Sequence, residues 1–366
     1  SIENLFDYHV ISNMTPSIDG YNAIKLLGNG DLVGIGVGRY EDGGLYSGIF
    51  HKYENEYTNY IPLLLSGLYH LENNSNTVIL NYRSGEKSPV SIIELDSRNV
   101  IFPNSGFYDD GSEDRGGVIQ LNLESEELVN IHNSDNSNTL GGFNGIFGGD
   151  SQDEARYTVM NEIEVYNNKI WIVNPYNELH GDVISSYNIN SDDWRGINVG
   201  NPDNFNDTHT LYLPQEIAFD NTGQLWVSFR NKDIPGSNQL YSYGGIRYVN
   251  SNNQFERVDN DEILIGGENS DIWSIDVCRY NDSDVLWVLS SDGVQGYTIF
   301  NNELNSILPT DLFIDIPFDK GDHIKCDQYS NVWITTMHSG VRVMLSEGSY
   351  TESWPSFSGL TSDSSG

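Results

Sequence analysis

An all-β fold made of repeated hairpins is what the sequence predicts, and three observations support it. The stretch from Leu213 to Arg230 reads as an alternating strand, a polar turn and a second strand that begins with Leu-Trp. Related stretches recur along the 366 residues, 46 to 92 residues apart. A second kind of hairpin, usually preceded by glycine, follows them. Because a single hairpin is marginally stable in water, each copy needs the others to bury its apolar face.

The best copy shows why each part forms. Ile217 and Phe219 alternate with polar or small residues, which is the period of a strand with one buried face. The run Leu225 to Phe229 is rich in β-branched and aromatic residues and suits a buried strand. Asp220-Asn221-Thr222-Gly223 lies between them, where Asp and Asn bond to their own backbone and Gly takes a positive φ. A tight hairpin is therefore expected here.

The copies can be aligned on Trp226, which we call the anchor position. Equivalent anchors are Trp171, Trp287 and Trp333, with weaker versions at Val33 and Ile79. Their spacings are 46, 92, 55, 61 and 46 residues, and 92 is twice 46. One unit has therefore lost its signature, and we expect it between Ile79 and Trp171.

The hairpins that follow the anchors give a second count. Seven can be read: GGLYSGIFHKYENEYTNYI, SPVSIIELDSRNVIF, GGVIQLNLESEELVNI, GDVISSYNINSDDWRGINV, GGIRYVNSNNQFERV, GVQGYTIFNNELNSI and GVRVMLSEGSYTESW. The two counts disagree over residues 103–156. Four short strands in each repeat of this length are typical of a β-propeller blade. We expect residues 1–366 to form one β-propeller of seven blades of four antiparallel strands, about 52 residues each; six and eight blades are the alternatives.

The motif Asp-x-x-Gly-x-Leu-Trp-Val resembles the two-component-regulator propeller repeats of bacterial sensor ectodomains. It is also similar to the PorZ-type surface propellers of the type IX secretion system. Asp220, Gly223 and Leu225 to Val227 match it, and Asp327 with Val332 to Ile334 follows it, with Ser330 in place of glycine. The family's Gly-Thr after the Trp-Val pair is replaced by Ser228-Phe229 and Thr335-Thr336. The resemblance implies a docking or sensing scaffold on the outside of a bacterial cell.

Composition restricts the partners. With 18 basic and 53 acidic residues the net charge is −35, which repels nucleic acid and anionic lipid. Basic, cationic or metal-bridged partners remain open. No run approaches the ~18 to 20 apolar residues of a membrane span, so we expect no membrane insertion. We expect Cys278 and Cys326 to be two free, buried thiols. A bridge requires Cα atoms within about 7 Å, and we do not expect the first strands of neighbouring blades to approach that closely. An extracellular, cell-surface or periplasmic protein is expected.

Catalytic motifs are missing from the sequence. The eight histidines form no HxxxH or HxH pair, and no GxSxG elbow occurs. One acidic loop offers carboxylates to a calcium ion, the one cofactor that the sequence suggests, although a chain this acidic also produces such loops by chance. The candidate ligands are Asp109, Asp110, Glu113 and Asp114.

Two functions remain as hypotheses. The first is a non-enzymatic scaffold that docks a protein or glycan partner through long inserts at residues 106–117, 132–153 and 231–245, because such loops vary without disturbing the blades. The second is a propeller enzyme acting on a glycan or lactone, with a metal and acidic residues at the axis. The axial funnel distinguishes the two: converging carboxylates, histidines or arginines there would favour the enzyme, and a small, water-filled funnel would favour the scaffold. The tail Trp354 to Gly366 resembles a linker before a new repeat, so we expect the natural chain to continue past Gly366.

Overall fold

A computed structural model gives the conformation of this chain. It describes residues 21–30, 32–36, 39–41, 44–46, 49–53, 56–59, 64–65, 68–73, 76–80, 92–96, 98–106, 115–125, 127–133, 136–140, 160–175, 177, 182–191, 193–198, 213–233, 240–242, 244–280, 282–307, 322–336, 340–345 and 350–351. Among these residues the one helical element is η4, a 3-10 helix at Asp261–Ile263. The predicted all-β class is confirmed.

Two compact units divide the chain: an N-terminal unit (residues 1–181 and 185–195) and a C-terminal unit (residues 182–184 and 196–366). The first nine strands are β1 (Tyr21–Leu26), β2 (Leu32–Gly36), β3 (Arg39–Glu41), β4 (Gly44–Tyr46), β5 (Ile49–Tyr53), β6 (Glu56–Asn59), β7 (Leu64–Leu65), β8 (Leu68–Asn73) and β9 (Asn76–Leu80). Strands β1, β2, β5 and β6 form a four-stranded sheet, β3 and β4 a ribbon, and β7 to β9 a three-stranded sheet.

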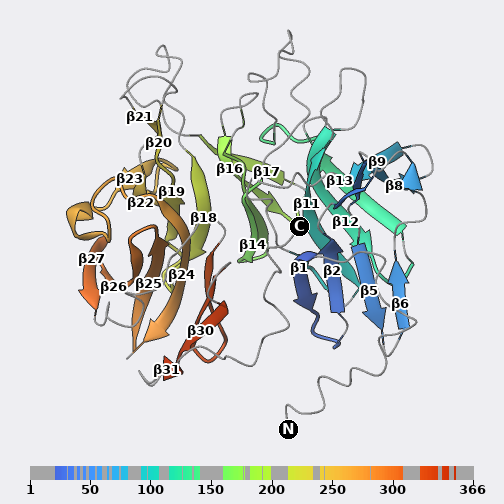
Figure 1. The fold of residues 1–366 in the computed structure, drawn as a ribbon. Helices are drawn as coiled ribbons and strands as arrows, with labels where there is room; N and C mark the ends of the chain where they lie inside the picture. The colour runs from blue at the N-terminus through green and yellow to red at the C-terminus, as the bar shows by residue number, and fades with distance from the viewer. Residues whose placement is uncertain are drawn as a thin grey trace. The chain divides into compact units, whose positions relative to one another are not determined.

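Five consecutive four-stranded blades follow (Figure 1). The first two are made of β10 (Ile93–Glu94), β11 (Asn99–Gly106), β12 (Arg115–Asn122) and β13 (Glu127–Asn133), and of β14 (Glu162–Tyr166), β15 (Lys169–Val173), β16 (Asp182–Asn188) and β17 (Asp193–Asn198). In both, the strands lie side by side in chain order.

The C-terminal unit holds the other three blades, coloured from yellow-green to red in Figure 1. They are β18 (Pro214–Phe219), β19 (Leu225–Phe229), β22 (Gly245–Val249) and β23 (Phe255–Arg257); β24 (Ile272–Tyr280), β25 (Ser283–Ser290), β26 (Gly293–Phe300) and β27 (Glu303–Ile307); and β28 (His323–Cys326), β29 (Val332–Thr336), β30 (Gly340–Met344) and β31 (Tyr350–Thr351). A ribbon of β20 (Lys232–Asp233) and β21 (Leu240–Ser242) projects between β19 and β22.

The expected count of seven four-stranded blades is wrong, although the propeller class holds. The described residues form the five consecutive blades and, before them, one four-stranded and one three-stranded sheet. The error lies in SPVSIIELDSRNVIF, which was assigned to an outer hairpin. It supplies β10 and β11, the inner hairpin of the next blade, because β12 and β13 pair on from β11. This is the unit expected between Ile79 and Trp171, with Ile101 and Phe102 buried where no tryptophan marks the strand.

Short turns close one end of these blades. The turn between the first two strands and that between the last two often carry residues with positive φ, as at Asn167 and Asn168 (53° and 58°), Gly223 (83°), and Asn301 and Asn302 (50° and 65°). Asn and Gly tolerate this region, which hairpin turns of this kind require. Because neighbouring strands are antiparallel, the connection between the second and third strands and the one that leaves the blade share the opposite end.

The core lies between successive sheets of the C-terminal unit. The indole of Trp226 in β19 packs with Ile275, Leu286 and Tyr297 of the next blade. Trp287 of that blade packs in turn with Ile324 and Val332 of the one after it. The first two blades of this unit therefore bury their anchor faces under the blade that follows, which explains why an isolated hairpin would not suffice.

Alignment of the four anchor tryptophans predicts equivalent, buried places for them, and this prediction is wrong because their burial differs. Trp226 and Trp287 are 0% and 4% exposed, Trp171 is half-buried, and Trp333 is 38% exposed. They do occupy the same register, since each lies in the second strand of its blade. In the C-terminal unit, no described sheet follows β28 to β31 to cover Trp333, so strand position alone does not set burial.

The prediction of two free thiols is also wrong. Cys278 and Cys326 form a disulfide with a Cα to Cα distance of 6.0 Å. They lie on β24 and β28, the first strands of consecutive blades, and these strands approach closely because the core between the blades is continuous. The sequence does not reveal this distance, since 48 residues separate the two positions.

Candidate functional site

The first strands of the C-terminal unit carry a row of polar side chains at equivalent positions. The residues paired with the anchors Trp226, Trp287 and Trp333 are Ala218, Asp276 and Lys325. Two residues before each of these stand Glu216, Ser274 and His323. Since strand side chains repeat with period two, the three occupy the same face of their blades.

These three side chains bond to one another across the three blades. Glu216 is 3% exposed, and its Oε1 lies 2.9 Å from His323 Nδ1. Its Oε2 accepts hydrogen bonds from Ser274 Oγ (2.5 Å) and from the backbone N–H of Ile275 (3.0 Å). Ser274 Oγ in turn accepts from the backbone N–H of Ile324 at 3.0 Å. The first strand of each blade is an edge strand, so some of its backbone N–H groups have no strand partner. The row provides acceptors for two of these groups, which would be costly to bury unpaired.

A second level of the same face holds Asp276 and Lys325. Asp276 Oδ2 accepts from the backbone N–H of Cys326 at 2.8 Å, and its Oδ1 accepts from Val277 at 2.8 Å. Burial raises the pKa of Asp276, against the opposing influence of Lys325 and of these backbone donors. Carboxylates, a histidine and a lysine thus converge on the inner strands of this unit.

The chemistry open to this cluster centres on His323. Its side chain is 40% exposed, whereas that of Glu216 is 4% exposed. When Glu216 is ionised, its Oε1 accepts a hydrogen bond from Nδ1–H of His323 and fixes the ring orientation. Nε2 is then the nitrogen able to accept a proton or a hydrogen bond from a ligand. An imidazole oriented in this way suits a general base or a ligand-binding group. The sequence contained a signal for it, since alignment on the anchors places Glu216, Ser274 and His323 in one column.

The aspartate of the repeat motif has a structural role in each turn where it occurs. Asp220 Oδ1 accepts from Thr222 N (2.9 Å), Thr222 Oγ1 (2.6 Å) and Gln224 N (3.0 Å), while Oδ2 accepts from Trp226 Nε1 at 3.0 Å. Asp327 repeats the arrangement with Tyr329 N (2.8 Å), Asn331 N (3.0 Å) and Trp333 Nε1 (2.9 Å). The carboxylate ties the turn to the anchor, so the motif is not itself a reactive site.

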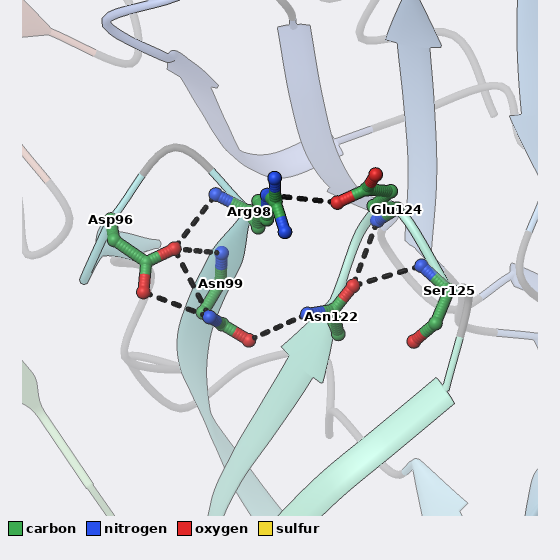
Figure 2. Close-up of polar contacts among 6 residues, drawn as sticks. All are labelled: Asp96, Arg98, Asn99, Asn122, Glu124 and Ser125. Carbon is green, nitrogen blue, oxygen red and sulfur yellow. Dashed lines mark hydrogen bonds and ion pairs between the residues drawn. The ribbon is translucent and has the colours of Figure 1, made fainter.

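The blade without a tryptophan uses the same device (Figure 2). Asp96 Oδ1 accepts from the backbone N–H groups of Arg98 (2.8 Å) and Asn99 (2.9 Å) in the turn between β10 and β11. Asn99 Oδ1 then accepts from Asn122 Nδ2 at 3.1 Å, and Asn122 Oδ1 holds the next turn through the N–H groups of Glu124 (3.0 Å) and Ser125 (2.8 Å). Figure 2 shows these bonds linking two turns at one end of the blade.

The cluster in Figure 2 is a turn scaffold, because the backbone uses most of its acceptors. Its ion pair, Arg98 Nε to Glu124 Oε2 at 2.8 Å, has side chains that are both well exposed, so it adds little stability. We assign no ligand to it.

The insert at residues 231–245 is clamped at its base. Asn231 Oδ1 accepts from the backbone N–H of Gly244 at 2.6 Å, which ties the two ends of the insert together. Its own N–H donates to Asp271 Oδ1 at 3.1 Å, and its Nδ2 donates to the carbonyl of Asn269. The ribbon β20 to β21 thus stands on a fixed stem, and it projects from the blade in Figure 1.

The insert at residues 132–153 is fastened where it leaves β13. Ser137 Oγ accepts from the N–H groups of Thr139 (3.2 Å) and Leu140 (3.1 Å), and Leu140 is fully buried. The carbonyl of Thr139 accepts from Asn177 Nδ2 (2.5 Å) and Ser185 Oγ (3.3 Å). Both inserts therefore leave their blades from ordered bases, at the end opposite to the short turns.

The acidic loop that was proposed to bind calcium is not described by the structure. Asp109, Asp110, Glu113 and Asp114 lie outside the described residues, so the calcium site stays a prediction. Within the described ranges, no group of three or more His, Cys, Asp or Glu side chains is arranged to hold a metal ion.

No family model and no curated protein matches the sequence. Solved structures do. The extracellular domain of a hybrid two-component system of B. thetaiotaomicron aligns with 92% of this chain at 12% identity and a TM-score of 0.50. PorZ, a surface component of the type IX secretion system of Porphyromonas gingivalis, aligns with 96% at 10% identity and a TM-score of 0.55.

The chain is a β-propeller. Its blades and the likeness to these propeller structures agree with the resemblance carried by the Asp-to-Trp motif. The propeller spans 35% and 44% of the length of those two proteins, and identity this low shows the fold alone. No helix among its described residues is long and apolar enough to cross a membrane.

Proposed function

We propose that this propeller is a non-enzymatic scaffold at the outside of a bacterial cell that docks a protein or glycan partner through its long inserts. The observation that carries the proposal is the clamped base of the insert at residues 231–245, where Asn231 joins Gly244 and Asp271. A rigid stem lowers the entropic cost of presenting a loop to a partner. The short turns at the other end bond mainly to themselves.

Charge and compartment support the proposal. A net charge of −35 favours a basic partner and raises the rate of encounter with it at low salt. The disulfide between Cys278 and Cys326 fits an oxidising compartment such as the periplasm or the cell surface. The two similar solved structures are described as an extracellular domain and as a bacterial surface component. A role in sensing or in type IX secretion is the part of this proposal that follows from resemblance.

The test replaces the tip of the insert, residues 234–239, with a Gly-Ser sequence of equal length and keeps Asn231 and Gly244. Binding is measured against a glycan array and against a panel of purified basic proteins, each at low and physiological salt. We expect a binder whose affinity falls at least tenfold in the variant, about 1.4 kcal/mol, with the melting temperature unchanged.

The matched control changes the opposite end of a blade, where Asn302→Gly keeps the positive φ of the turn between β26 and β27. This variant should bind as the wild type does. The scaffold proposal fails if no probe binds the wild type, or if the control loses as much affinity as the insert variant.

A second candidate function rests on the Glu216, Ser274 and His323 cluster. A buried carboxylate that orients a partly exposed imidazole could serve a propeller enzyme acting on a glycan or lactone. The purified wild type, Glu216→Gln and His323→Gln are assayed with both substrate classes. Turnover by the wild type that both variants lose would establish the enzyme, whereas an absence of turnover in all three supports the scaffold.

A further inference from the structure

The Cys278–Cys326 disulfide joins two blades at their first strands. Cys278 lies on β24 and Cys326 on β28, and these strands belong to different sheets. Cys278 is buried in the core between the blades, and Cys326 packs against the same core. The bridge is therefore a covalent link across a packing interface between two sheets whose described strands do not pair with each other.

Two side-chain hydrogen bonds flank the bridge. Ser274 Oγ accepts from the N–H of Ile324 at 3.0 Å, and Asp276 Oδ2 accepts from the N–H of Cys326 at 2.8 Å. Both acceptors are on β24 and both donors on β28. The three links lie within a few residues of one another, so each depends on the alignment that the other two maintain.

The blade beyond the bridge has less to hold it than its predecessors. Its four strands contain 4, 5, 5 and 2 residues, against 9, 8, 8 and 5 in the blade before it. Its anchor, Trp333, is 38% exposed, whereas Trp287 is 4% exposed. In the described part of the C-terminal unit, only the face toward β24 to β27 is covered. Such a small, one-sided element belongs to the low-stability end of a structure.

We infer that the Cys278–Cys326 disulfide is a redox-sensitive cross-link that couples the folding of the blade β28 to β31 to the thiol–disulfide state of its surroundings. A dithiol reductant breaks the S–S bond through a mixed disulfide. Two electrons and two protons pass to Cys278 and Cys326, and the reductant leaves as its own disulfide. The blade then unfolds locally while the two preceding blades keep their shared core around Trp226.

Chain entropy gives the size of the effect. Because β24 to β27 stay folded, the part of the 48-residue loop that the bridge restricts on opening is residues 308–326. For about 19 residues the loop-closure relation gives roughly a two-hundred-fold effect on the opening equilibrium. The effect is confined to segments whose unfolding requires β24 and β28 to separate. Strands β18 and β19 are outside that loop.

Hydrogen exchange with mass spectrometry on the full chain tests the inference. The oxidised protein, the protein reduced with a phosphine, and the double variant Cys278→Ser/Cys326→Ser are compared peptide by peptide. We expect amides of β28 to β30 to exchange 10² to 10³ times faster in the reduced protein and in the double variant, about 3 to 4 kcal/mol, while β18 and β19 stay protected. Adding the phosphine to the double variant is the control and should change nothing.

Equal protection of β28 to β30 before and after reduction would overturn the inference, as would a uniform loss across the C-terminal unit. The reduced wild type keeps the test valid if the double variant does not fold, because it is first folded in the oxidised form.

Discussion

Asp327 Oδ2 accepts a hydrogen bond from the indole N–H of Trp333 at 2.9 Å, and Asp220 Oδ2 accepts the same bond from Trp226 at 3.0 Å. The two pairs share one local geometry although one indole is 38% exposed and the other is fully buried. The local motif thus fixes the turn and the orientation of the ring. The burial of the ring depends on the sheet that packs against it.

Truncating the two anchors should therefore have unequal effects. Trp226→Ala removes a fully buried ring from the core between two blades and should cost about 3 to 5 kcal/mol in the free energy of unfolding. Trp333→Ala should cost about 1 to 2 kcal/mol, because much of the ring is already in water. Urea titrations monitored by circular dichroism measure both values. Equal losses would contradict the difference in burial.

The indole of Trp287 provides a second comparison. Its Nε1 is buried and has no hydrogen-bond partner, whereas the Nε1 of Trp226 is bonded to Asp220. Replacing a tryptophan by phenylalanine removes the N–H in both cases. Trp287→Phe should be less destabilising than Trp226→Phe by about 1 to 2 kcal/mol, since only the second leaves an acceptor unpaired. The same unfolding titration decides, and a reversed order would be incompatible with these bonds.

The turn at Asp327 should make stability depend on acid. Burial opposes ionisation, but hydrogen bonds from the Trp333 indole, the Asn331 side chain and the backbone of Asn331 and Tyr329 together lower the pKa of Asp327 to about 2. A depressed folded-state pKa stabilises the protein above the unfolded value of 3.8 and loses that contribution as pH falls toward 2. Asp327→Asn should flatten the decline in stability between about pH 4 and pH 2. Chemical unfolding across that range measures the slope, and an unchanged slope would refute the assignment.

Gly245 occupies a position where both conformation and space require glycine. Its φ is +89°, and an added Cβ would lie 2.6 Å from the carbonyl oxygen of Glu268. Gly267 has a similar φ of +88° with nothing within 4 Å. Gly267→Ala should cost about 1 kcal/mol of stability through backbone strain alone, and Gly245→Ala clearly more. Melting temperatures of the two variants provide the comparison, and equal shifts would show that the close approach has no energetic effect.

Deleting the tip of the insert at residues 106–117, residues 107–114, should weaken partner binding and leave the melting temperature nearly unchanged. Strands β11 and β12 pair from Asn99 with Asn122 as far as Gly106 with Arg115, so a short turn can replace the tip. Isothermal titration with a binder found in the glycan or basic-protein screen measures the affinity. A fall in melting temperature of several degrees would instead make the loop part of the fold.

The rate of association with a basic binder should fall between low and physiological salt, because charges are screened within about 8 Å at 0.15 M.

Local chemistry determined the parts of this protein that the sequence predicted correctly. The inner hairpin around Trp226 and six of the seven outer hairpins followed from alternation, turn residues and glycine, which act over a few neighbouring residues. The hairpin of β10 and β11 was misassigned because its inner strand has Ile101 and Phe102 where other blades have tryptophan. Without the anchor tryptophan, the sequence of an apolar inner strand cannot be distinguished from that of an outer strand.

Only the tertiary structure decided which repeated residues became alike in environment. Trp226, Trp287 and Trp333 share a register, but the sheet stacked on each one sets its burial. Cys278 and Cys326, and Glu216 and His323, meet because first strands of different blades pack side by side, which brings together positions 48 and 107 residues apart. Distances across such an interface depend on how whole sheets stack. Local sequence preferences act within a single hairpin and carry no information about them.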